Sequence, residues 1–181
     1  MKVTVIGRGN VGGGLARLWR QAGHDVDELG KDGGDASAAE VVLLAVPSAA
    51  VPDALGKVTG LEGKVVIDAT NRVRTGPPEG FDSIVEYVKS ITGGPVAKAF
   101  NLNFARLYDQ IGNQPVKPGN LYCADEEARG VTEQLIRDAG YEPVSLGGLE
   151  NAGTQEDAIA LFFALAGEGP VFCRFWQPGE L

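Results

Sequence analysis

The sequence has few of the residues that most often carry acid–base, thiol or metal chemistry. Its 181 residues include one histidine, His24, and two cysteines, Cys123 and Cys173. Two cysteines give no disulfide framework and are typical of a reducing compartment, so we expect a cytoplasmic protein. We predict no metal site.

Long apolar runs and an excess of positive charge are also missing. No apolar run reaches the length of a membrane span, and the chain starts directly on a predicted strand without a signal peptide. The net charge of −8 makes nucleic acids and anionic membranes poor partners. A hydrophobic content of 44% and a charged content of 22% are typical of a soluble globular protein, and 181 residues fit one domain with a small appendage.

Residues 1–28 combine a strand, a glycine-rich turn and a helix. Residues 3–6 are a short run rich in β-branched residues, which is typical of a strand. The pattern GxGxxG follows at residues 7–12, and apolar residues then recur at helical spacing until Gly23, which we expect to end the helix. This context favours nucleotide binding over an ordinary glycine-rich turn without ligand.

Each glycine of the pattern has a predicted task. Gly7 permits the tight turn, Gly9 lets a pyrophosphate approach the backbone, and Gly12 lets the helix pack on the strand. The free N–H groups and the positive dipole end of the helix would then face the phosphates.

The rest of the chain alternates between strand and helix patterns. Strands are predicted at 25–29, 40–46, 64–68, 95–100, 119–123 and 142–146, and helices at 51–58, 81–91, 102–111 and 125–139. This alternation predicts an α/β fold, a Rossmann-type, doubly wound and mostly parallel sheet with ligands at the carboxyl ends of the strands.

We divide the chain into a nucleotide-binding domain, residues 1–146, and a small helical C-terminal extension, residues 147–181. Residues 158–166 are apolar all round, so we expect a buried helix there. It would pack either on the edge of the sheet or on a second subunit.

The cofactor form depends on the tip of the second strand, where an acid would bind the ribose hydroxyls of NAD. The predicted tip is Gly30 followed by Lys31, which makes room for a 2′-phosphate and pairs with it. This favours NADP; the alternative is NAD, with Glu28 as the acid.

Arg8, Lys31, Arg72 and Arg74 all follow predicted strand ends and would form a basic rim, although Arg72 and Arg74 fit solvated loop charges equally well.

The sequence offers no convincing proton-transfer residue. His24 lies at a helix-to-strand junction, on the edge opposite the expected ligand crevice, where capping the helix is its natural role. Lys98 lies near the end of a predicted buried strand, and a structural role, with the side chain reaching outward, is favoured over catalysis. We therefore predict no catalytic residue and a reaction that requires only hydride transfer, such as flavin or deazaflavin reduction by a nicotinamide.

Five motifs in order, GRGNVG at 7–12, GK at 30–31, LAVP at 44–47, DATN at 68–71 and KAFN at 98–101, resemble the coenzyme F-420-dependent NADP oxidoreductases. Residues 148–152 and 169–181 also look similar to that family. The resemblance implies a Rossmann fold with a small helical C-terminal part, hydride exchange between NADP and coenzyme F-420, and a homodimer.

The resemblance also implies which residues bind the cofactor. Pyrophosphate would be held by Gly7, Arg8, Gly9, Asn10 and Val11, and the 2′-phosphate by Gly30 and Lys31 in place of the usual Ser-Arg pair. The path from adenosine to nicotinamide would be lined by Ala45, Val46 and Pro47. The nicotinamide would be bordered by Ala99, Phe100 and Asn101. Asn71 is the last predicted cofactor-binding residue.

Two other functions stay open at this point. One is an NADPH-dependent reductase that uses FAD or FMN, similar to the ferric reductases. The other is a non-catalytic module that senses dinucleotides; such modules usually keep an acid at the tip of the second strand, and Gly30 argues against that alternative.

Overall fold

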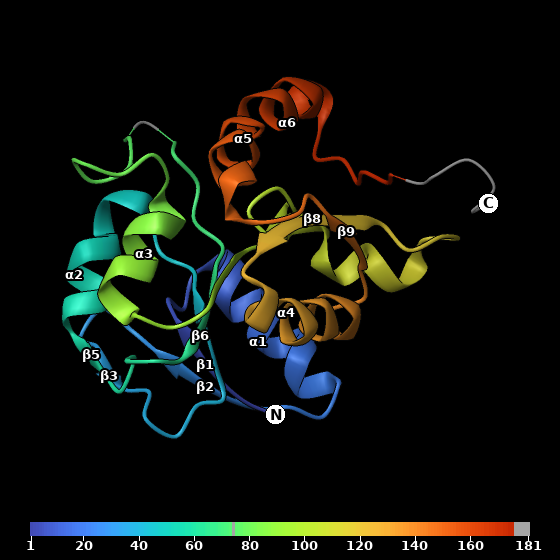
Figure 1. Cartoon of the computed structure of the whole chain (residues 1–181). Coiled ribbons are helices and arrows are strands. Elements are labelled where there is room, and N and C mark those ends of the chain that lie inside the picture. Colours follow the sequence, from blue (N-terminus) through green and yellow to red (C-terminus); the bar gives the residue numbers. More distant parts are fainter. Residues whose placement is uncertain (74, 176–181) are drawn as a thin grey trace.

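The computed structural model describes residues 1–73 and 75–175, and its helices cover both faces of a twisted sheet (Figure 1). Within these residues seven strands form one sheet. In their order across the sheet they are β2 (Asp25–Leu29), β1 (Lys2–Ile6), β4 (Val41–Leu44), β6 (Val65–Asp68), β7 (Val96–Lys98), β8 (Gly119–Ala124) and β9 (Glu142–Ser145). The predicted α/β, mostly parallel fold is confirmed.

The central strands are buried because their side chains are apolar on both faces. All four residues of β4 are buried, as a parallel strand covered by helices on each side requires. Strand β1 lies between β2 and β4 and is parallel to both. The chain therefore leaves β1 toward β2 and returns on its other side as β4, which opens a crevice at the carboxyl ends of β1 and β4.

Strand β8 runs against the direction of its neighbour. It pairs antiparallel with β7, and β9 then pairs parallel with β8. The segment between β7 and β8, where we expected an α-helix at 102–111, is a 3-10 helix, η2 (Ala105–Asn113), which packs against α1. Because η2 does not carry the chain back along the sheet, β8 begins at the edge where β7 ends.

The helices form two layers, one on each face of the sheet. Helices α1 (Asn10–Gln21) and α4 (Glu126–Asp138) share one core with η2, and the indole N–H of Trp19 on α1 donates to the carbonyl of Leu135 on α4. The other face carries α2 (Val51–Gly56), preceded by the short η1 (Ser48–Ala50), and α3 (Ile84–Thr92).

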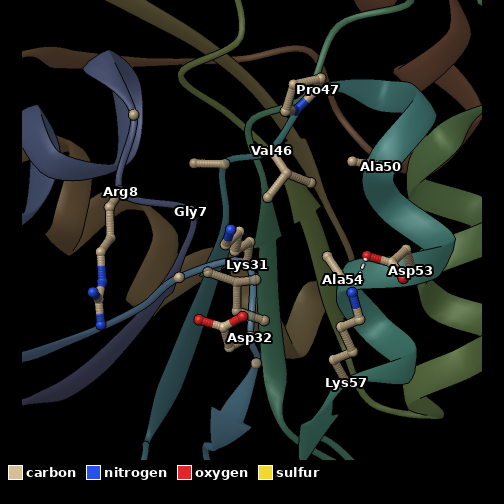
Figure 2. A pocket seen from close by; sticks show the side chains of 15 residues that line it. Gly7, Arg8, Lys31, Asp32, Val46, Pro47, Ala50, Asp53, Ala54 and Lys57 are labelled. Atoms are coloured by element: carbon tan, nitrogen blue, oxygen red, sulfur yellow. Dashed lines mark hydrogen bonds and ion pairs between the residues drawn. The ribbon is translucent and has the colours of Figure 1, made fainter.

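A second, two-stranded sheet lies beside the first. It pairs β3 (Gly34–Asp35) with β5 (Val58–Thr59) in parallel. The loop after β2 is thereby attached to the end of α2, and these two segments face each other across the crevice (Figure 2).

The C-terminal part consists of η3 (Leu149–Asn151), α5 (Ala152–Asp157), α6 (Ile159–Leu165) and η4 (Ala166–Glu168), and α5 lies next to β8 (Figure 1). Helix α5 buries Ala152, Gln155 and Glu156 against the sheet and α3. The division of the chain at residue 146 stays a prediction.

The helix expected at 158–166 is not buried on all sides within the single chain, and its packing on a second subunit stays a prediction. In α6 Phe162 is buried, but Leu161, Phe163 and Leu165 are 60%, 52% and 51% exposed. The reason is that α6 extends beyond the sheet, so one side packs and the other meets solvent. A helix that is apolar on all sides can be buried by its own chain or by another subunit, and the sequence pattern does not distinguish the two.

Among the described residues, no helix combines the length and the apolar character that crossing a bilayer requires.

Candidate functional site

The glycine-rich turn between β1 and α1 has the geometry that its sequence predicts. Gly7 has φ of +112°, and a Cβ there would lie less than 3.0 Å from the carbonyl oxygen of Ala45. A Cβ on Gly12 would come equally close to the carbonyl oxygen of Gly7, so α1 packs directly on the turn. The predicted tasks of Gly7 and Gly12 are confirmed.

The start of α1 is open toward the crevice. Gly9 is its N-cap residue, without a side-chain capping hydrogen bond, and a Cβ there would meet no described atom within 4 Å. The first backbone N–H groups of α1 have no partner within the helix, and residues 9–11 line a cavity, which is the arrangement in which a helix N-terminus binds an anion.

Three adjoining cavities follow this edge of the sheet. The first, of about 540 Å³, lies between the turn after β2 and helix α2 (Figure 2). The second, of about 350 Å³, shares Gly9 and residues 45–47 with it. The third, of about 160 Å³, shares Val11, Ala69 and Asn71 with the second and is closed by Ile159 and Phe163 of α6.

The structure brings most of the predicted cofactor residues together along these cavities. The first is lined by Gly7, Arg8, Gly9, Gly30, Lys31, Ala45, Val46 and Pro47, the second adds Asn10, Val11 and Asn71, and the third adds Phe100 and Asn101. Ala99 is buried in the core and lines none of the three.

The first cavity has a cationic side. Arg8 and Lys31 line it, and Gly30 follows directly on the last residue of β2, as predicted. The carboxylate of Glu28 does not line any of the three cavities and lies 2.7 Å from Arg20 of α1. Glu28 is therefore poorly placed for the ribose contact that the NAD alternative requires.

Two acids and one base of this cavity were missed in the sequence. Asp32 lies beside Lys31 at the tip of the turn that Gly30 and Gly33 close. Asp53 of α2 pairs at 2.7 Å with Lys57, the residue that follows this helix (Figure 2). Asp32 follows Gly30-Lys31 in the sequence and could have been considered from that position. The placement of α2 opposite this turn has no local sequence signal.

Lys98 is fully buried and does not reach outward as expected. Its ammonium lies 2.8 Å from Asp68 and 2.9 Å from Glu156, and all three side chains have no exposed surface. Burial raises the pKa of Glu156, an effect that Lys98 opposes. This arrangement supports the structural role predicted for Lys98, because its charge is already paired twice.

The other two candidates from the sequence also serve structure. The His24 ring nitrogen Nε2 lies 2.8 Å from Asp138, which connects the end of α1 with the end of α4. Arg72 pairs with Glu156 at 3.1 Å and with Asp157, so it attaches the loop after β6 to α5 rather than forming part of the rim. Arg74 lies outside the described residues.

The second and third cavities are lined by apolar and neutral polar side chains. Of the described residues, no Asp, Glu, His, Lys, Arg, Tyr or Cys lines either cavity. Ser48 and Thr70 supply hydroxyl groups to the second cavity, and the other polar groups are amides. The side chains of Asn71 and Asn101 bond to each other, and Gln155 of α5 donates to Asn101 Oδ1 at 2.8 Å. The donor set can orient a ring or bind a carbonyl, but it contains no general acid or base.

Phe100, between these amides and β7, has an unusual backbone. Its φ is +63°, the one positive φ of a non-glycine residue in the described chain. Its N–H donates to Asn120, and its ring packs edge-on against Trp19. A bulky side chain in this region of φ costs of order 1–3 kcal/mol and persists only where the surroundings enforce it. The turn that carries Asn101 into the third cavity is thus held by the core.

The strand order, the glycine-rich turn and the cavities at the carboxyl ends of the strands define a Rossmann-like NAD(P)-binding fold. Over residues 28–72 the sequence matches the family described as NADP oxidoreductase, coenzyme F420-dependent. That segment includes the tip of β2, β4 and Asn71. The family resemblance inferred from the motifs is confirmed over this segment, and no curated protein sequence matches the chain.

Solved structures share the fold. A protein of Arthrobacter sp. FB24, proposed to be an F420-dependent NADP-reductase, matches with a TM-score of 0.80 and 20% identity over 98% of this chain and 100% of its own. The hypothetical protein SMa0349 of Sinorhizobium meliloti matches with a TM-score of 0.67 and 25% identity over 84% of this chain and 88% of its own.

A longer enzyme is similar as well. A reductive aminase from Aspergillus terreus, solved with NADPH and ethyl levulinate, matches with a TM-score of 0.67 and 17% identity. The match covers 92% of this chain but 62% of the aminase, so this chain spans less than two thirds of that protein.

Proposed function

We propose that the protein transfers a hydride between NADP(H) and a deazaflavin, coenzyme F-420. In this assignment the 2′-phosphate of the dinucleotide binds at Gly30 and Lys31, the pyrophosphate at the start of α1, and the nicotinamide toward Asn71, Phe100 and Asn101, along the three cavities in turn. The match of residues 28–72 to the F420-dependent NADP oxidoreductases supports this proposal.

The observation that carries the proposal is the lack of any titratable side chain among the described residues that line the second and third cavities. Reduced NADP supplies a hydride when bound, and the proton that completes the reduction of the deazaflavin comes from solvent, so the reaction needs no acid or base from the protein. The chain then needs only to position two rings against each other, which the apolar walls and the Asn71–Asn101 amide pair can do.

The direct test mixes the protein with NADPH and coenzyme F-420 and follows the deazaflavin absorbance. We expect the band to bleach in proportion to enzyme. Folded protein that binds NADPH without bleaching would contradict the proposal. Parallel reactions with FMN, FAD and a cyclic imine in place of F-420 identify a different acceptor, and tight binding without turnover on every acceptor indicates a sensing module.

Lys31 provides a prediction about the coenzyme. Lys31→Glu places a carboxylate at the proposed 2′-phosphate site, so we expect the KM for NADPH to rise far more than the KM for NADH. Steady-state kinetics with both coenzymes measures this difference. Equal effects on the two would refute the assignment of Lys31.

A homodimer is also part of the proposal. Leu161 and Leu165 lie four residues apart on α6 and so share one face, and both are more than half exposed. Exposed apolar side chains next to a binding site are typical of surfaces that associate.

A further inference from the structure

The side chain of Arg8 does not follow the glycine-rich turn toward the start of α1. It runs instead to the tip of β2, where Nε and Nη2 donate to the carbonyl oxygen of Glu28 at 3.2 Å and 2.8 Å. A Cβ added to Gly30 would lie 3.5 Å from the guanidinium carbon, so the group is in van der Waals range of the residue that directly follows the strand. Arg8 is thereby fixed at the ribose end of the site rather than at the pyrophosphate end.

The two hydrogen bonds leave part of the guanidinium available. Its five N–H groups form a planar fork, and two are used at Glu28. Within the described residues, Nη1 has no hydrogen-bond partner, and Arg8 lines the first cavity together with Lys31 (Figure 2). A planar fork with free donors is the group best suited to a phosphate.

Acidic side chains near Arg8 would repel a phosphate, but most of them are already paired with other cations. Glu28 is paired with Arg20, and Asp53 is paired with Lys57 across the cavity. Asp32 is exposed at the tip of the turn, next to Lys31. The two positive charges of Arg8 and Lys31 therefore exceed the single negative charge of Asp32, the carboxylate of this turn without an ion-pair partner among the described residues.

From this geometry we infer that the side chain of Arg8 is the guanidinium that selects the 2′-phosphate of the dinucleotide, with Lys31 as the second cation. The inference rests on the proposed NADP(H) site and refines it. The tip of β2 is followed by Gly30 and Lys31, which offer no guanidinium, and Arg8 supplies one from the glycine-rich turn. The backbone amide of Arg8 remains free to contact the pyrophosphate.

The test compares two nucleotides that separate the phosphates. Adenosine 2′,5′-bisphosphate carries the 2′-phosphate, and ADP carries the pyrophosphate without it. Calorimetric titration of the wild-type protein should give the tighter Kd for the 2′,5′-bisphosphate. Arg8→Leu should weaken that binding by about tenfold or more, the size expected for a lost charge-assisted hydrogen bond, and leave ADP binding within about twofold.

Arg17→Leu is the matched control, because it removes the same charge from an exposed position on α1 where Arg17 pairs with Asp109. It should leave both affinities unchanged. Arg8→Lys keeps the charge but not the fork and should give an intermediate loss for the 2′,5′-bisphosphate, so the inference stays testable if Arg8→Leu does not fold.

The outcomes separate the inference from the proposed function. Equal weakening of both nucleotides by Arg8→Leu, or no weakening of either, overturns the role of Arg8 while leaving the NADP(H) site in place. Wild-type protein that binds neither nucleotide nor NADPH overturns the proposed function and this inference with it.

Discussion

Three consecutive glycines, Gly12, Gly13 and Gly14, follow the first two residues of α1, and each has different neighbours. Gly12 lies against the carbonyl of Gly7, and a Cβ on Gly14 would lie less than 3.0 Å from the ring of Tyr108. At Gly13 the nearest atom to an added Cβ is the carbonyl oxygen of Arg8 at 3.5 Å, an ordinary contact distance. The helix therefore needs glycine at two of the three positions.

We predict that Gly13→Ala stabilises the protein by about 0.4–1 kcal/mol, because it removes backbone freedom from the unfolded chain without a clash. Gly12→Ala should destabilise it, since the turn has to open around the new methyl group. Urea unfolding of both variants measures the difference. Destabilisation by Gly13→Ala of the same size as by Gly12→Ala would show that the turn does not tolerate any side chain.

Buried ionisable groups in the core predict a loss of stability at alkaline pH. Burial raises the pKa of the Cys123 thiol to about 12 and also raises the pKa of the Tyr108 and Tyr141 phenols. Below the ordinary pKa values, about 8.5 for the thiol and 10 for the phenols, folded and unfolded chains hold the same protons. Above them the unfolded chain ionises first, so the free energy of unfolding falls by up to about 1.4 kcal/mol per pH unit for each group.

Urea unfolding between pH 7 and pH 11 should show a plateau and then this decline. Tyr108→Phe should reduce the slope, and at pH 7 it should change stability little, because the buried hydroxyl has no hydrogen-bond partner among the described residues. An unchanged slope in that variant would exclude Tyr108 as a source of the decline.

At the scale of elements, α5 is attached to the sheet by charge. Glu156 contacts Lys98 of β7 and Arg72, and its carboxylate accepts from the N–H of Ile84 at the start of α3. Asp157, the next residue, pairs with Arg72 but is 74% exposed. Two neighbouring acids on one short helix thus share a partner while differing completely in burial.

We predict that Glu156→Leu lowers the free energy of unfolding by about 3–5 kcal/mol, because it removes one of the two acids paired with buried Lys98 and leaves the N–H of Ile84 without this acceptor. Asp157→Leu, the matched control, should cost less than about 1 kcal/mol, as exposed ion pairs do. Denaturant unfolding of both variants provides the comparison. Similar costs would show that burial of Glu156 contributes nothing beyond a surface pair.

The elements that the sequence predicted well are those with a local cause. Strands β1, β4 and β6 follow from runs of apolar or β-branched residues, and the turn follows from the glycine spacing. The direction of β8 could not be predicted, because it depends on where the segment before it returns to the sheet. Nor could the direction of the Arg8 side chain, which is decided by a carbonyl of β2, or the pairing of Lys98 with an acid of α5.

At the scale of the whole molecule, the apolar face of α6 predicts the state of association. If Leu161 and Leu165 form the proposed dimer contact, the mass in solution is twice the 18.9 kDa of one chain. Leu161→Asp should give monomers, because a carboxylate would be desolvated at the contact. Ile91→Asp, at an exposed apolar position on α3, should leave the dimer intact. Light scattering coupled to gel filtration measures the mass, and a monomeric wild-type protein would contradict the proposal.

The reversal of β8 and β9 decides how the last part of the chain reaches the crevice. Strand β9 ends at the opposite edge of the sheet, and α5 returns over β8, bringing Glu156 to Lys98 and placing Phe163 of α6 at the third cavity. If the C-terminal part were replaced by that of a relative, the hybrid would therefore function only if the new segment also placed an acid next to Lys98. Recombination between relatives should therefore succeed only when the crossover keeps Lys98 and Glu156 together.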